Sequence, residues 1–192
     1  MSTDSPNGAL EPTIFYLALY YIRTAGNVNK WHWSLIAFDV TSSKWYLHHA
    51  IDDGRDDPQF FVEAREYDDP MKSRSMVVCL QLAPSPDTPV LQRAIRSIEF
   101  PRMVEEAHRA GEWGICRVWI KKVLGALEDA KCLSFPCSID CLERAAVRQA
   151  EYYFARGLQG HNSLSIHPNW WQITTPCRWH VLSYQQVKAQ GE

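Results

Sequence analysis

Long apolar runs and a surplus of positive charge are both missing from this 192-residue sequence, and its first residues do not predict a secretory leader. No apolar stretch approaches the ~20 residues that a membrane-spanning helix needs. The 20 basic residues face 22 acidic ones, so a nucleic-acid partner has little electrostatic support. Residues 1–12 are polar and short of positive charge, unlike a secretory signal. We therefore expect no membrane span, no nucleic-acid partner and a cytoplasmic location.

The six cysteines could pair in principle. Without a leader they are expected to be reduced thiols. Cys132, Cys137 and Cys141 lie close together, and His161 or His167 would complete a zinc site. Zinc sites more often use two close pairs separated by a longer gap. We therefore expect no metal and no cofactor.

Apolar residues make up 46% of the chain and charged residues 22%, which is typical of a globular domain. Its first half favours strands, because aromatic and β-branched residues dominate the apolar runs. The expected strands are Thr13–Thr24, Lys30–Val40, Lys44–Ile51, Gln59–Glu66 and Ser75–Leu82. The second half has helical spacing, with expected helices within Val90–Ile98, Arg102–Ala110, Gly114–Ala130 and Ile139–Gly157.

Strands followed by helices predict an α+β fold, with an antiparallel β-sheet or a small barrel packed on helices. We expect a flexible arm over residues 1–12 and a single domain over 13–192. In that domain strands occupy about 13–82, helices about 90–157 and a C-terminal tail 158–192, which returns a strand or an ordered loop to the core. The sequence leaves the oligomeric state open.

Cys116 is the first residue that suggests chemistry. Its thiol is expected in the first turn of a helix, where free backbone N–H groups and the helix dipole favour a thiolate. Gly114, just before it, allows a substrate to approach the backbone closely. A small buried core cysteine is the alternative interpretation.

His32 is a candidate base for that thiol. It lies mid-strand, on the same face as Ser34 and opposite Trp33. The next strand carries His48 and His49, and one of them would hold the His32 ring. A two-residue loop at Ser42-Ser43 puts His49 on the His32 face, and a one-residue slip would put His48 there instead. Asp52 or Asp53 would serve if that strand runs longer.

These motifs carry a family resemblance over residues 14–130. His32-Trp33-Ser34 on an early strand, a polar residue on the next strand and Cys116-Arg117-Val118-Trp119 on a late helix occur in this order. The pattern resembles the circularly permuted papain-like proteins, including NlpC/P60 and lecithin:retinol acyltransferase-like enzymes. It is nearest to an uncharacterised family with H-W-S and G-C-R-x-W motifs.

The resemblance implies a cysteine-dependent hydrolase or acyltransferase that acts on an amide, ester or thioester bond of a small-molecule or acyl substrate. Cys116 would be the nucleophile, His32 the base and His49, or His48, the orienting group. The expected substrate-binding residues are Trp33, Ser34, His48, Trp113, Gly114 and Trp119. Ile115 departs from the Asn or Gly that more often precedes this cysteine. Two alternatives stay open: a non-catalytic binding module, and a cofactor-free cyclase or isomerase of an apolar small molecule.

Overall fold

The structure, a computed structural model, describes residues 10–22, 31–55, 58–112, 114–155 and 165–167. Its strands are β1 (Ile14–Tyr21), β2 (Trp31–Asp39), β3 (Lys44–Asp52), β4 (Phe60–Tyr67), β5 (Met76–Pro84) and β6 (Ser165–His167). Its helices are α1 (Thr88–Arg96), α2 (Phe100–Arg109), α3 (Ile115–Asp129) and α4 (Ile139–Ala155), with a short 3₁₀ turn at Pro70–Lys72. Each of the five strands and four helices expected before residue 158 is present, within a few residues at either end.

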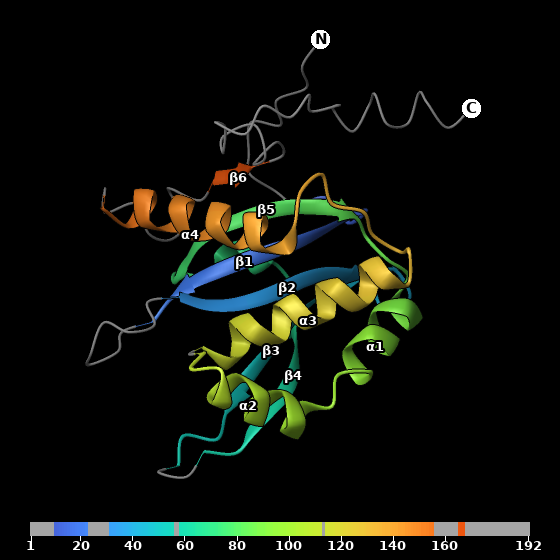
Figure 1. Cartoon of the computed structure of the whole chain (residues 1–192). Helices are drawn as coiled ribbons and strands as arrows, with labels where there is room; N and C mark the ends of the chain where they lie inside the picture. Colours follow the sequence, from blue (N-terminus) through green and yellow to red (C-terminus); the bar gives the residue numbers. More distant parts are fainter. Residues whose placement is uncertain (1–9, 23–30, 56–57, 113, 156–164, 168–192) are drawn as a thin grey trace.

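The strands form one sheet in the order β4-β3-β2-β1-β5-β6 (Figure 1). Strands β1 to β5 pair antiparallel, and β6 joins β5 in parallel. The α+β prediction is confirmed. The small barrel is not formed by the strands described here, because β4 and β6 are the two edges of an open sheet. Residues 156–164 and 168–192 of the expected tail, and residues 1–9 of the expected arm, lie outside the described residues.

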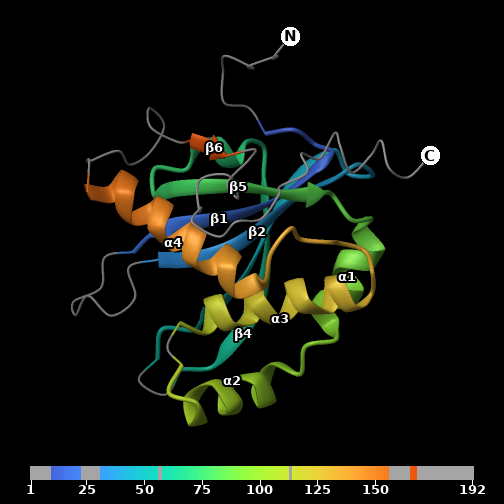
Figure 2. The same cartoon turned by 45° about the horizontal axis from the view of Figure 1, so that its top comes forward.

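All four helices lie on one side of the sheet (Figures 1 and 2). The main core joins them to Trp31, Trp33, Leu35 and Ala37 of β2, which alternate along the strand and so share one face. A second, smaller cluster on the other face contains Tyr16, Tyr20 and Ile36. His32 belongs to this second face, since its neighbour across β1 is Tyr20.

Strands β2 and β3 diverge toward the end that carries His32. Their ladder covers only Leu35–Asp39 of β2, with Leu35 opposite His48 and Asp39 opposite Lys44. Figure 1 shows β3 and β4 running steeply across the direction of β1, β2 and β5. The His32 end of β2 is therefore left without a β3 neighbour in the ladder.

The turn between β2 and β3 is longer than the sequence predicted. Residues 40–43 separate the last pair, and Ser43 takes a positive φ of 56°. The predicted two-residue turn is therefore wrong. The pairing shifts by two residues, and an even shift keeps every side chain on its face. His49 accordingly stays on the His32 face, as predicted, and His48 lies on the face of the helices.

Candidate functional site

Cys116 is the second residue of α3 and so lies in the first turn of a helix, as the sequence predicted. The helix begins after Gly114, which has φ of 84° and ψ of 71°. This left-handed conformation suits glycine, because a Cβ there is strained. The carbonyl of Gly114 accepts hydrogen bonds from the N–H groups of Arg117 and Val118 at 2.9 and 3.2 Å. Trp113, an expected substrate-binding residue, lies outside the described residues.

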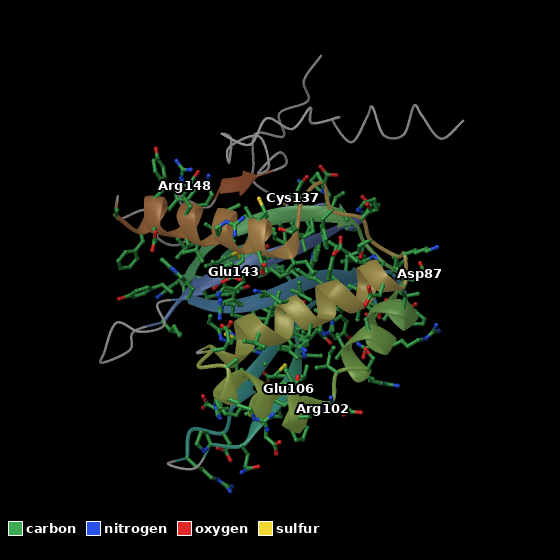
Figure 3. The ribbon with its side chains drawn as sticks, viewed as in Figure 1. Asp87, Arg102, Glu106, Cys137, Glu143 and Arg148 are labelled. Atoms are coloured by element: carbon green, nitrogen blue, oxygen red, sulfur yellow. The ribbon has the colours of Figure 1, made fainter. Side chains whose placement is uncertain are left out.

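Arg117 ties the first turn of α3 to its surroundings. Its guanidinium contacts the carboxylates of Glu112 and Glu143, and Glu143 projects from α4 toward α3 (Figure 3). Lys121, one turn later, also binds Glu143, at 2.8 Å. Arg117 and Glu143 are only 23% and 18% exposed in their side chains, so this network is better shielded than a typical surface ion pair. The turn that carries Cys116 is thus held against both the preceding loop and α4.

A chain of three polar side chains crosses β2, β3 and β4. His32 Nε2 lies 2.6 Å from His49 Nδ1, and His49 Nε2 lies 2.7 Å from Glu63 Oε2. Both contacts join neighbouring strands, and His49 stands directly opposite Glu63 in the ladder. His32 Nδ1 has no hydrogen-bond partner among the described residues, and it is not one of their buried unpartnered atoms. Nδ1 of His32 is therefore the ring nitrogen of this relay that lacks a hydrogen-bond partner among the described residues.

Helix α3, which carries Cys116, packs against β2. The backbone of Trp33, the residue after His32, is the first hydrogen-bonding group that lowers the pKa of this thiol. Within the described ranges no hydrogen bond joins Cys116 to His32 or His48. The expected direct contact between Cys116 and His32 is therefore not formed, because α3 packs on the Trp33 face while the His32 ring turns to the other. The thiol is therefore on the side of β2 that Trp33 faces, and the imidazole of the preceding residue, His32, is on the opposite side.

Burial keeps both partners uncharged in this structure. It raises the pKa of the Cys116 thiol, and the backbone N–H groups around it offset this only in part. It also lowers the pKa of His32 to about 4, with a further lowering by His49 and an opposing effect of Asp52. The expected lowering of the thiol pKa by the helix N-terminus is thus outweighed by desolvation. A preformed thiolate–imidazolium pair is not favoured here.

His48 is buried among apolar residues instead of joining the relay. It is 3% exposed, it stacks on Tyr46 with ring centroids 6.3 Å apart, and burial lowers its pKa to about 4. Of the two adjacent histidines, His49 is therefore the one that contacts His32.

The other residues expected to contact a substrate are mostly part of the core. Trp119 is 0% exposed and Trp33 is 3% exposed, both within the main core cluster. Ser34 is also fully buried, and its hydroxyl has no hydrogen-bond partner within the described chain. Gly114 is partly exposed at the start of α3. The backbone at Gly114 is therefore partly accessible, whereas Trp33 and Trp119 are packed in the core.

No three His, Cys, Asp or Glu side chains of the described ranges are grouped so that they could hold a metal ion. The zinc alternative at Cys132, Cys137 and Cys141 also needed His161, which lies outside those ranges, or His167. Within the same ranges no helix combines the length and apolarity needed to cross a membrane.

Glu63 is the residue that sequence reasoning missed. It lies in a strand that was predicted as Gln59–Glu66, but its role depends on the β3–β4 register. Asp52 and Asp53, the acidic residues considered for this role, lie beyond the relay. Asp53 instead accepts a hydrogen bond from the N–H of Gln59 at 3.1 Å. The signal that identifies Glu63 is the pairing register of β3 with β4, which places Glu63 opposite His49.

A scan against protein-family models finds no match for this chain, and searches of curated proteins and of solved structures also find none.

Proposed function

We propose that the chain is a thiol-dependent hydrolase or acyltransferase, in which Cys116 attacks an acyl carbon and His32 handles the proton. The observation that carries this proposal is the His32–His49–Glu63 relay. Its unpartnered nitrogen is on His32, the residue before Trp33, whose backbone lowers the pKa of the Cys116 thiol. Titratable side chains that are partly buried and joined by hydrogen bonds are more frequent at functional sites than elsewhere, and this supports a functional role for the relay.

The chemistry begins with two neutral groups. The proton of the Cys116 thiol moves to the His32 ring as sulfur attacks, so that a C–S bond forms and the acyl group's bond to its leaving oxygen, nitrogen or sulfur breaks. The leaving group takes the proton from His32. Water, or an acceptor alcohol, amine or thiol, then attacks the thioester and gives its proton to the same ring. The C–S bond breaks, and the Cys116 sulfur takes that proton back from His32. Free N–H groups of the first turn of α3 would stabilise the oxyanion.

The substrate would have to bring sulfur and imidazole together. Catalytic hydrogen bonds are often long without substrate and tighten in the complex. Because the two groups lie on opposite faces of β2, the proposal requires substrate binding to move the His32 end of this strand, which has no β3 neighbour in the ladder.

The test is to trap the acyl-enzyme. The full chain is mixed with p-nitrophenyl butyrate, quenched in acid, digested and read by peptide mass spectrometry, with release of p-nitrophenol followed in parallel. We expect a butyryl group on Cys116 and a burst of about one p-nitrophenol per chain. Cys116→Ser should abolish both, whereas Cys132→Ser, which removes an exposed thiol, should change neither. Equal labelling of Cys116 and Cys132 without a burst would refute the proposal.

A further inference from the structure

We propose that Glu63 is a positioning residue that fixes the tautomers of two histidines, so that Nδ1 of His32 is the basic nitrogen of the site. Only the catalytic consequence rests on the proposed function, since the tautomers themselves follow from hydrogen bonding.

The direction of each hydrogen bond follows from Glu63. A carboxylate accepts hydrogen bonds and does not donate them, so the 2.7 Å contact requires the proton to be on His49 Nε2. In a neutral imidazole the other nitrogen is then an acceptor, which is His49 Nδ1. The 2.6 Å contact between the rings therefore requires a proton on His32 Nε2. That leaves the lone pair of His32 on Nδ1, the atom without a partner among the described residues.

The relay holds this arrangement only while His49 is neutral. A doubly protonated His49 would donate from Nδ1 and force the proton of His32 onto its own Nδ1, which would block the base. Burial lowers the pKa of His49, and Arg65 on β4 lowers it further, against the raising effect of Glu63. The other titratable groups around the two rings are Tyr20 on β1, with His48 and Asp52 on β3.

Glu63 is suited to a test by substitution, because its side chain is 41% exposed and its loss does not open the core. Glu63→Gln keeps the size but presents an amide, which can accept from His49 or donate to it. The matched control is Glu66→Gln on the same strand, whose carboxylate binds Lys44 at 3.3 Å near the surface.

The measurement is a two-bond ¹H–¹⁵N correlation spectrum of the full chain labelled with ¹⁵N-histidine, at pH 7. His32→Asn and His49→Asn assign the two rings. We expect both rings of the wild type to be pure Nε2–H tautomers, and Glu63→Gln to turn His49 into a mixture, while Glu66→Gln matches the wild type.

A proton on Nδ1 of His32 in the wild type would overturn the inference, and so would unchanged rings in Glu63→Gln. The wild-type spectrum can refute the inference by itself, so the test remains valid even if a variant does not fold. The spectrum is also independent of thiol chemistry. If the tautomers are as stated but Cys116 is never acylated, the proposed function fails and the tautomer inference stands.

Discussion

His48 and His49 are adjacent in the sequence and lie in opposite environments. His48 points to the helix side of the sheet, stacks on Tyr46 and makes no side-chain hydrogen bond to another described residue. His49 points to the other side and is hydrogen-bonded at both ring nitrogens, to His32 and to Glu63. The same residue type is therefore buried in an apolar core at one position and used in a polar relay at the next.

The difference shows that burial alone does not mark a functional histidine. His48 is 3% exposed and His49 is 9% exposed, and burial lowers the pKa of both. What distinguishes His49 is the chain of partners on both neighbouring strands. The same substitution made once on each face of the sheet, at His32 and at His48, can test this distinction.

The largest effect should come from removing the base. His32→Asn removes the only relay nitrogen without a partner in the described chain, so we expect p-nitrophenyl butyrate turnover to fall by roughly 10²–10⁴-fold. His48→Asn makes the same chemical change on the helix side and should lower turnover less than about threefold, the limit we set for a residue outside the relay. Steady-state kinetics at pH 7 measures both.

Thermal unfolding of both variants is the control, because it shows whether a loss of activity comes from a loss of folded protein. If His48→Asn lost activity as strongly as His32→Asn, then His48 would be the base and the relay on the other face would be structural.

The next effect is on stability in acid. The pKa of buried His48 is about 4, below the ordinary 6.5, so the unfolded chain binds a proton that the folded chain does not. The free energy of unfolding should therefore decline as the pH falls from about 6.5 to 4. The part due to His48 is roughly 3 kcal/mol. His32 adds to this loss in the same direction, since its pKa is also lowered to about 4.

Urea unfolding of the wild type and of His48→Phe at pH 7 and at pH 4 measures this part. The variant should lose roughly 3 kcal/mol less than the wild type between the two pH values, whatever its packing costs at pH 7. Equal losses in His48→Phe and the wild type would show that His48 is protonated in the folded chain without penalty.

Much of the fold was predictable because each half of the chain has a single, strong periodicity. Alternation along Lys30–Val40 gave the faces of His32 and Trp33, and helical spacing gave a helix that begins near Cys116. The placement of His49 was right although the predicted turn was wrong, because the error in the register was even.

The rest of the site depends on tertiary contacts that periodicity does not encode. Which face of β2 meets the helices is decided by the larger apolar face, and Trp31, Trp33 and Leu35 belong to it. The expectation that His32 would face α3 failed for this reason. Glu63 required the β3–β4 register, and the burial of Trp119 required the packing of α3 on the sheet.

The smallest effect concerns two tyrosines on the relay side of β1, Tyr16 and Tyr20. The hydroxyl of Tyr16 accepts a 2.6 Å hydrogen bond from the N–H of Glu11. The buried hydroxyl of Tyr20 lies near that of Ser34, but neither of these two hydroxyls has a partner of suitable geometry among the described residues. Removing a paired hydroxyl leaves a donor unsatisfied, but removing an unpaired buried one relieves a desolvation cost. We expect Tyr16→Phe to lower the free energy of unfolding by about 1 kcal/mol and Tyr20→Phe to leave it unchanged or raise it by up to about 1 kcal/mol. Urea unfolding at pH 7 separates them, and a loss of about 1 kcal/mol in Tyr20→Phe would show that the relay side of the sheet supplies this hydroxyl with a hydrogen-bond partner.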